Sequence, residues 1–214
     1  MPIRHKLENQ PIDLSALTNE GVLALQHYLD HGQRLPAVSS KTSYRDIWCH
    51  TRRFQTHRRT TIAGVALRVR AFSRSSKETF SKTVLDLPKD SADRKAFLEK
   101  QRQTITTLSD GCLRMQQVCE EFEKDSEGDL ARLQEEVSKV RDLTKARERR
   151  ELLTKSTRSL PVVRLMAGAF KQHSSELAMI QQKLTLFEND GTDSFRHIVT
   201  ILETGAAGQI MHLA

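Results

Sequence analysis

Histidines are the residues of this sequence whose spacing could bind a metal. His27 and His31 lie four positions apart, and His50 and His57 lie seven apart. A histidine pair at i, i+4 on a helix can hold zinc, but no glutamate follows in an HExxH arrangement and the third ligand is missing. We therefore expect no metal site. We expect His27 and His31 to lie on a solvated helix face near the helix end.

Three cysteines, Cys49, Cys112 and Cys119, are the candidate nucleophiles. Their odd number and the lack of a CxxC motif argue against a zinc site or a disulfide framework. Cys49 precedes His50, but adjacent side chains on a helix point about 100° apart and do not form a catalytic pair. Cys112 and Cys119 are separated by about 10 Å on one helix, too far for a bridge. We expect all three thiols to be reduced and mostly buried.

Motifs of the common enzyme classes are missing from the sequence. It contains no GxSxG, P-loop or GxGxxG pattern. The acidic residues Glu120, Glu121 and Glu123 spiral round a predicted helix, as solvated flanks do, and do not converge on a pocket. We therefore predict no catalytic residue, no cofactor, no small-molecule substrate and a non-enzymatic function.

Positive charge is concentrated in one part of the chain. The formal net charge is +7, and residues 41–82 hold eleven Lys and Arg against two Asp and Glu, which leaves −2 elsewhere. Arginine binds phosphate in a bidentate manner and is less strongly hydrated than lysine. The residues predicted to contact an anionic partner are Arg52, Arg53, Arg58, Arg59, Arg68, Arg70 and Arg74.

The alternative for these arginines is internal pairing with acids of a neighbouring helix, for which Glu99, Glu120, Glu121, Glu123, Glu127, Glu135 and Glu136 are available. Eleven cations exceed what one neighbouring helix can neutralise, because only part of each face meets it. Some arginines should stay solvated, and Arg52, Arg53, Arg58 and Arg59 are the densest group. Nucleic acid is the less favoured partner, because no helix-turn-helix, RRM or zinc-finger pattern accompanies the arginines.

The elements that carry these residues are predicted to be helices. Only 37% of the 214 residues are apolar and 5% aromatic, and nine glycines and five prolines are few for this length. Residues 1–17 lack periodicity and are expected to form an extended arm. Thr18 is a suitable N-cap for a short helix with Val22, Leu25 and Leu29 on one face, which stops at Gly32 and Pro36.

A second helix is predicted over residues 44–86, with Pro88 ending it. Its apolar side chains fall at helical spacing, and they are Ile47, Phe54, Ile62, Val65, Val69, Phe72 and Phe80.

A third helix is predicted without a break from 92 to 155. Its apolar positions alternate in steps of three and four, the pattern of a coiled-coil seam. The seam residues are Ile105, Leu108, Cys112, Met115, Cys119, Phe122, Ser126, Leu130, Leu133, Val137, Val140 and Thr144. Residues 127–129 could kink this helix, but the seam keeps its phase across them.

Residues 157–161 are predicted to end the third helix, and Pro161 fits the first turn of a fourth helix over 161–189. A last helix is expected over 192–203, followed by a frayed tail at 205–214. The sequence therefore predicts a single all-α domain over 1–214, an elongated antiparallel bundle with long coiled-coil-like helices.

Export and membrane signals are weak. The first ten residues hold no apolar stretch of a secretory signal. The least polar run, 160–170, is interrupted by Arg164 and is far shorter than a membrane span. We expect synthesis in the cytoplasm, and the sequence leaves open action at a membrane or export by another route.

Three stretches carry a resemblance to a known family. LTNEGVLALQHYLDHGQRLP (17–36) is a short helix followed by proline, and residues 47–88 hold Trp48 near the start, a central Ala-Phe and a final Leu-Pro. LAMIQQKLTLFENDGTDSFRHIV (177–199) fits two last helices. Together, over about half the chain, they resemble the xenorhabdolysin A type of α-helical pore-forming toxins, distant relatives of haemolysin E. The resemblance implies a helical body that engages a membrane.

The sequence departs from that family at one place. Family members carry an apolar head between their long helices, whereas the corresponding segment here, ARERRELLTKSTRSLP (146–161), is strongly basic. This puts membrane insertion by that segment in doubt. We expect a protein that acts by helix-mediated assembly, with itself or with a helical partner protein, and a pore-forming-toxin-like component at an anionic membrane. The alternative is a basic helical adaptor or scaffold for an acidic protein or nucleic acid.

Overall fold

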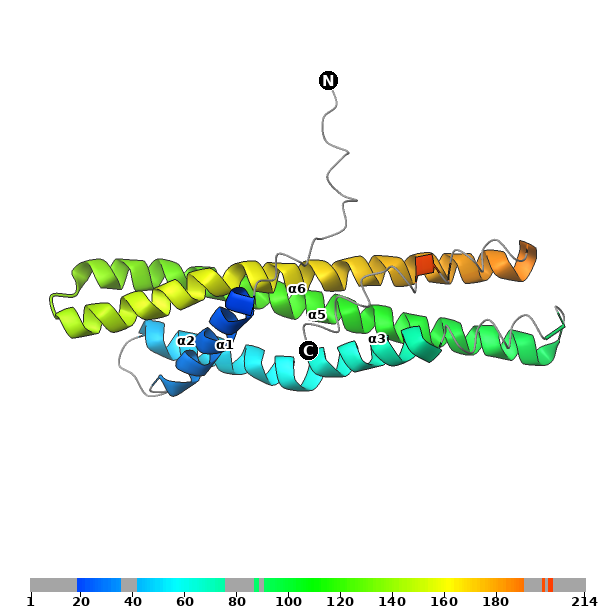
Figure 1. The fold of residues 1–214 in the computed structure, drawn as a ribbon, viewed down its shortest axis with the longest axis horizontal. Helices are drawn as coiled ribbons and strands as arrows, with labels where there is room; N and C mark the ends of the chain where they lie inside the picture. Colours follow the sequence, from blue (N-terminus) through cyan, green and yellow to red (C-terminus); the bar gives the residue numbers. More distant parts are fainter. Residues whose placement is uncertain are drawn as a thin grey trace, which may run out of the picture.

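The computed structural model describes residues 19–35, 42–75, 87–88, 91–190, 198 and 200–201, and in these residues it contains helices and no strand. The helices are α1 (Asn19–Arg34), α2 (Thr42–His57), the π-helical turn η2 (Arg58–Ile62), α3 (Ala63–Ser75), α5 (Ala92–Lys139) and α6 (Leu143–Asp190). This confirms the predicted all-α, elongated bundle (Figure 1).

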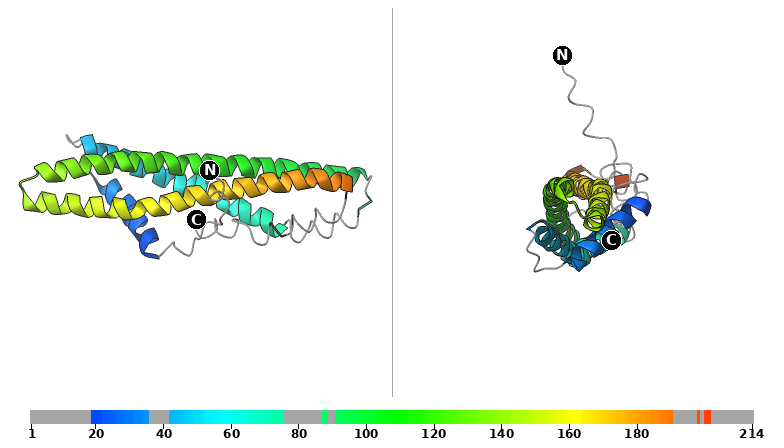
Figure 2. Two further views of the ribbon diagram at one scale, coloured as in Figure 1. Left: turned by 90° about the horizontal axis from the view of Figure 1, so that it is seen from above. Right: turned by 90° about the vertical axis from the view of Figure 1, so that its left-hand side faces the viewer.

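An antiparallel hairpin of two long helices, α5 and α6, forms the body of the molecule. Each has 48 residues, which corresponds to about 70 Å at about 1.5 Å per residue. The arm α2–η2–α3 runs along α5, and α1 crosses the hairpin obliquely (Figures 1 and 2). The apolar core lies where the helices face one another.

The third predicted helix, 92–155, is wrong at its C-terminal part. Helix α5 ends at Lys139, and Val140 takes an extended conformation with φ −84° and ψ 121°. The side chain of Asp142 then caps α6, because its Oδ1 accepts hydrogen bonds from the backbone N–H groups of Thr144 at 3.0 Å and Lys145 at 3.3 Å. This N-cap begins a new helix although the apolar spacing continues through it.

The predicted stop at 157–161 is also wrong, because α6 runs through it with Pro161 inside. The proline ring is exposed, so the carbonyl that loses its helical partner is on the solvent side. Its neighbours Leu160, Val162 and Val163 are buried. Their burial favours a continuous helix over a break at the proline. The basic segment 146–161 is therefore helical and does not connect two helices.

Most of the predicted core is confirmed. The buried residues of the arm are Ile47, Phe54, Ile62, Val65, Val69 and Phe72, and those of the seam are Ile105, Leu108, Cys112, Met115, Cys119, Phe122, Ser126 and Leu133. Leu130, Val137 and Val140 are half-buried, and Thr144 is exposed. Asp129 occupies the inner position expected of Leu130. In α1, Val22 is exposed and Tyr28 is buried beside Leu25 and Leu29.

Several predictions fall outside the described residues. They are the arm 1–17, the N-cap Thr18, the helix portion 76–86 with Phe80, and the tail 205–214. Of the last predicted helix, residues 198, 200 and 201 are described and helical, and Ile198 is buried in the core. Within the described residues, no helix combines the length and the apolar character needed to cross a membrane.

Candidate functional site

The predicted anion-binding arginines lie along the arm α2–η2–α3. The side chains of Arg52, Arg53, Arg68 and Arg74 are exposed and that of Arg58 is half-buried, whereas the side chains of Arg59 and Arg70 are outside the described part of the structure. The exposed arginines face different environments on α5, and those environments decide what each can bind.

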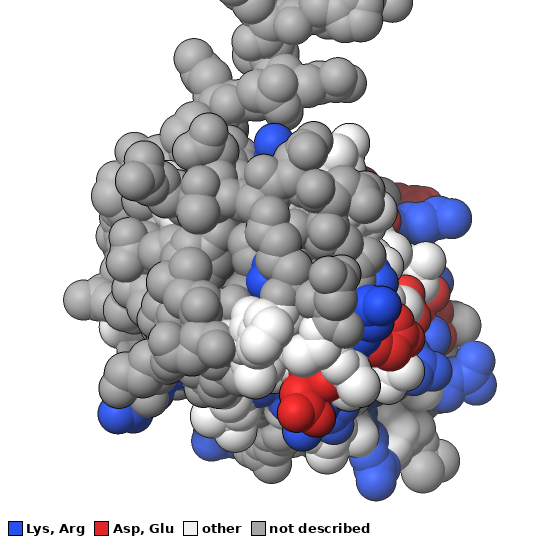
Figure 3. All heavy atoms as spheres, turned by 90° about the vertical axis from the view of Figure 1, so that its right-hand side faces the viewer, with Lys and Arg blue, Asp and Glu red and all other residues white. Residues whose placement is uncertain are grey.

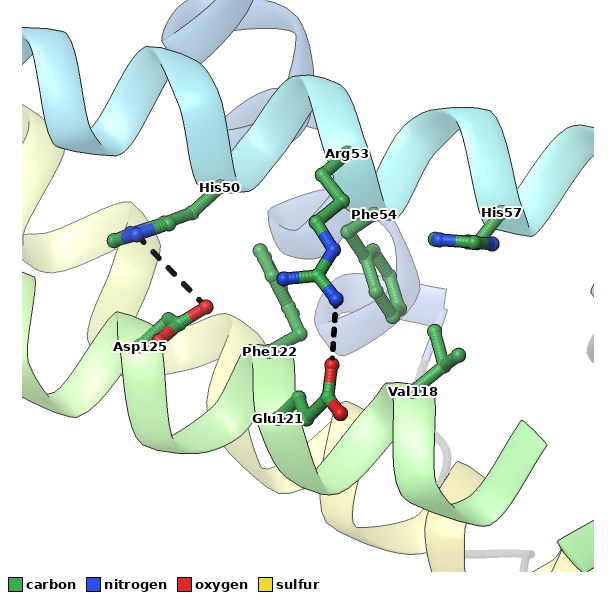
Figure 4. Close-up of a pocket in the computed structure, with 8 residues that line it drawn as sticks. All are labelled: His50, Arg53, Phe54, His57, Val118, Glu121, Phe122 and Asp125. Carbon is green, nitrogen blue, oxygen red and sulfur yellow. Dashed lines mark hydrogen bonds and ion pairs between the residues drawn. The ribbon is translucent and has the colours of Figure 1, made fainter. Parts of the chain in front are cut away.

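Beside α2, the facing surface of α5 is acidic. We call this contact the polar seam: His50 and Arg53 of α2 against Glu121, Asp125 and Asp129 of α5. Figure 4 shows all of these residues except Asp129. The hollow between the two helices has a volume of about 10 Å³, about enough for one water molecule.

The aromatic side chains of Phe54 and Phe122 form one wall of this hollow. The rings of Phe54 and Phe122 stack with centroids 4.0 Å apart and an interplanar angle of 14°. Such stacking adds to the apolar burial of both rings. The polar seam is therefore closely packed and offers no space for an organic ligand.

Asp129 is the buried centre of the polar seam. Its side chain is 0% exposed, and its Oδ2 lies 2.9 Å from Nδ1 of His50. Arg132 donates to the other carboxylate oxygen at 2.9 Å and to Asp46 of α2 at 2.6 Å. A buried carboxylate needs such partners, because taking a charge out of water is costly. These contacts connect α2 to α5.

The packing shifts the pKa values of this cluster. The hydrogen bond to Asp129 raises the pKa of His50 above its usual value, and the charges of Asp129, Asp125 and Asp46 act in the same direction, against the effect of burial. Burial raises the pKa of Asp129, although His50 and Arg132 oppose it. Burial and the charge of Asp129 also raise the pKa of Tyr28 on α1, so this phenol stays protonated.

Arg53, Arg58 and Arg52 each contact a described residue of the chain. Arg53 donates to Glu121 at 2.9 Å, with both side chains more than half exposed. Arg58 donates to the side chain of Gln26 on α1 at 2.6 Å, and the guanidinium of Arg52 lies 4.9 Å from the centre of the Trp48 ring. The internal-pairing alternative is confirmed for Arg53.

Three other acids of α5 pair with residues outside the arm. Glu123 and Glu127 both accept from Arg164 of α6, and Glu135 pairs with Lys139 within α5. Cationic and anionic side chains also lie next to each other on the end of the molecule shown in Figure 3. The acids of α5 are therefore shared between partners on α2, α5 and α6.

The histidine and cysteine predictions have mixed outcomes. His27 is exposed as predicted, but His31 is half-buried and burial lowers its pKa. Cys49 is exposed, so its predicted burial is wrong, because α2 turns Ile47 and Thr51 inward.

Cys112 and Cys119 are buried free thiols as predicted, and burial raises both pKa values to about 12. Thiols with so high a pKa are poor nucleophiles at neutral pH. Over the described ranges, no cluster of three or more His, Cys, Asp or Glu side chains is arranged to hold a metal ion.

Sequence reasoning missed Asp129, Asp46 and Arg132. One signal was present: Asp129 lies three residues after Ser126 and four before Leu133, which is the spacing of the buried face. An acid at core spacing requires a buried partner, and His50 was available on the neighbouring helix.

No family model, curated protein or solved structure matches this chain.

Proposed function

We propose that this protein is a non-enzymatic helical-bundle protein that acts by helix-mediated assembly, with a second copy or with a helical partner protein. The observation that carries this proposal is the shape of the body: a hairpin of two 48-residue helices with an arm along one side. Such a rod presents long helical faces, which suit docking of another helix.

Exposed leucines on three elements support this proposal. Leu23 of α1 is 55% exposed, Leu67 of α3 is 63% exposed, and Leu143 at the tip of the hairpin is 87% exposed. Single exposed leucines are common on protein surfaces. Their positions on α1, on the arm and at the tip of the hairpin make them suitable apolar anchors for a contact with a polar rim.

An anionic membrane surface is the second partner in this proposal, as the resemblance to pore-forming toxins implies. Arg52 and Arg68 are exposed on the arm and can approach lipid phosphates. The basic segment 146–161 lies within α6 and carries many charged side chains, which favours contact with the surface of the bilayer over insertion.

The experiment is size-exclusion chromatography with light scattering at two protein concentrations, with and without anionic liposomes. We expect a mass above that of the monomer or co-elution with the liposomes. Leu67→Glu and Leu143→Glu should reduce the mass, whereas Gln182→Glu, the same charge change at an exposed position of α6, should not. A strict monomer that ignores lipid would contradict the proposal.

The second candidate function is a basic adaptor for an acidic protein or nucleic acid. It is favoured by Arg68 of α3 and Arg114 of α5, which are exposed and form no hydrogen bond or ion pair with another described residue. Binding of polyglutamate and of a nonspecific oligonucleotide, each at two salt concentrations, tests it. Binding with a steep salt dependence supports the adaptor, and no binding at low salt contradicts it.

A further inference from the structure

A groove of about 520 Å³ opens between the arm and α5, beyond the polar seam. We call it the α3–α5 groove. One wall carries Thr60, Thr61 and Arg68, and the other carries Thr107, Asp110 and Arg114. Its volume falls within the range of about 300 to 1,000 Å³ that is typical of small-molecule sites.

A π-helical turn and two glycines lie along the walls of this groove. The π-helical turn η2 directly precedes α3, and such turns often occur at functional sites. Gly64 follows it, and a Cβ there would meet nothing within 4 Å. On the opposite wall, a Cβ at Gly111 would lie 3.3 Å from Cγ2 of Val65. The two walls therefore approach at Gly111 and leave open space at Gly64.

The two walls supply unpaired guanidinium groups. Arg68 and Arg114 come from different helices, are both exposed, and make no ion pair or hydrogen bond with any residue in the described ranges. Arg53 and Arg164, in contrast, are paired with acids of α5. A guanidinium group matches phosphate oxygens in a bidentate manner, so the groove offers strong donors to an anion.

The other polar groups of the groove are acceptors. The hydroxyl of Thr60 donates to the carbonyl of Thr56 at 2.8 Å, and that of Thr107 donates to the carbonyl of Gln103 at 2.9 Å. The hydroxyl of Thr61 lies 3.3 Å from that of Thr60 and can donate to it. Because each hydroxyl hydrogen is already used, the oxygen is left to accept. The carboxylate of Asp110 also accepts only. A ligand for this groove therefore needs hydroxyl donors as well as an anionic group.

We propose that the α3–α5 groove binds a phosphorylated polyol, with its phosphate between Arg68 and Arg114 and its hydroxyls donating to Asp110 and the threonines. This chemistry is shared by free sugar or inositol phosphates and by the headgroups of inositol lipids. The proposal is independent of helix-mediated assembly, because it concerns a site within one chain.

Isothermal titration calorimetry of the full chain at low salt tests this proposal with three probes. Inositol trisphosphate should bind, inorganic phosphate should bind more weakly because it lacks the hydroxyls, and unphosphorylated inositol should give no measurable heat. If inositol trisphosphate does not bind, the proposal is wrong. If inorganic phosphate binds as tightly, recognition of the polyol is wrong.

Variants locate the site. Arg68→Gln and Arg114→Gln should each weaken binding of inositol trisphosphate by about tenfold, the effect of losing a charge-assisted hydrogen bond. Arg150→Gln, an exposed arginine of α6 outside the groove, is the matched control and should leave affinity unchanged. If it weakens binding equally, the attraction is nonspecific and the site is wrong. Circular dichroism checks that each variant is folded.

Asp110→Asn distinguishes recognition of the ligand's hydroxyls from recognition of its phosphate. It removes a negative charge, which favours both anionic probes, and it weakens the acceptor for the hydroxyls, because an amide oxygen accepts less strongly than a carboxylate. The preference for inositol trisphosphate over inorganic phosphate should therefore fall. Equal effects on both probes would overturn the role of Asp110. Vesicles with an inositol bisphosphate lipid, compared with phosphatidylserine vesicles of equal charge, then show whether the groove reaches a membrane-bound headgroup or only the free ligand. Tighter binding to phosphatidylserine would overturn the proposal.

Discussion

Helix α5 meets the two halves of the arm in different ways. Beside α2 it presents Glu121, Asp125 and Asp129, and the contact is closed. Beside η2 and α3 it presents Thr107, Asp110, Gly111 and Arg114, and the contact is an open groove. The arm carries arginines along both halves. A run of positive charge in a sequence therefore does not locate free cations, since the facing helix decides which are neutralised.

Depth of burial distinguishes the two contacts as strongly as charge does. The polar seam buries a carboxylate completely, whereas both arginines of the groove are exposed. Substitutions in the polar seam should therefore change stability, and those in the groove should change ligand binding with little effect on stability. Three stability measurements in these two regions test this contrast, and a fourth tests the packing of α1 on α2.

Asp129→Ala should have the largest effect. It removes a buried acceptor from His50 and Arg132, and we expect the free energy of unfolding to fall by about 3 kcal/mol. Urea unfolding followed by circular dichroism measures the change. Glu121→Ala is the control, because Glu121 pairs with Arg53 at the exposed edge of the polar seam and such pairs contribute about 0 to 1 kcal/mol. Equal losses in both variants would contradict the importance of burial.

Gly32→Ala tests how closely α1 and α2 are packed against each other. A Cβ at Gly32 would lie 2.5 Å from Cγ2 of Thr51, a short and buried side chain that cannot move aside. We expect a loss of about 2 kcal/mol in the free energy of unfolding. Gly128→Ala is the matched control in α5, since its Cβ would meet only Arg132 Nη2 at 3.9 Å. If the control loses as much stability, the close packing at Gly32 is not the cause.

The fold was largely predictable because apolar spacing is a property of the sequence alone. Six arm residues from Ile47 to Phe72 and the seam from Ile105 to Phe122 are buried as their period indicates. The boundary between α5 and α6 was not predictable from this period, because the spacing persists through Val140. Local cap chemistry at Asp142 decides it. The break predicted at Pro161 is wrong because the packing of its buried neighbours outweighs the helical hydrogen bond that the proline cannot donate.

The candidate site was less predictable than the fold. The sequence shows that Arg53 and Arg68 lie in one basic stretch, but not that one faces Glu121 and the other a groove. That difference depends on the register between two helices far apart in sequence. The π-helical turn at 58–62 shifts this register, and no residue pattern in it distinguishes it from an ordinary helical turn.

His50→Gln tests the charged contact of the polar seam through pH. Because the pKa of His50 is raised in the folded state, its contribution to stability is complete below the unfolded pKa of about 6.5 and is lost as pH rises through the folded pKa. The raised pKa of Asp129 acts in the same direction at lower pH.

The wild type should therefore exceed His50→Gln in stability by about 1.5 kcal/mol at pH 6, the lower end for a hydrogen bond to a charged group, and by less at pH 9. Urea unfolding at both pH values measures the gap. His57→Gln is the control, because His57 lines the same hollow but forms no hydrogen bond or ion pair with a described residue. A gap that widens with pH would show that the neutral form of His50 is the stabilising one.

Gly64→Ala should give the smallest effect and the opposite sign. Gly64 begins the open stretch of the α3–α5 groove, and a Cβ there meets no atom within 4 Å. Alanine favours a helix over glycine, so we expect the free energy of unfolding to rise by about 0.5 kcal/mol. Gly111→Ala on the facing wall should gain less or lose stability, because its Cβ would lie 3.3 Å from Val65. Chemical denaturation of both variants measures the difference. A loss at Gly64 would mean that the two walls close on each other in solution, and then the groove would have no room for a ligand.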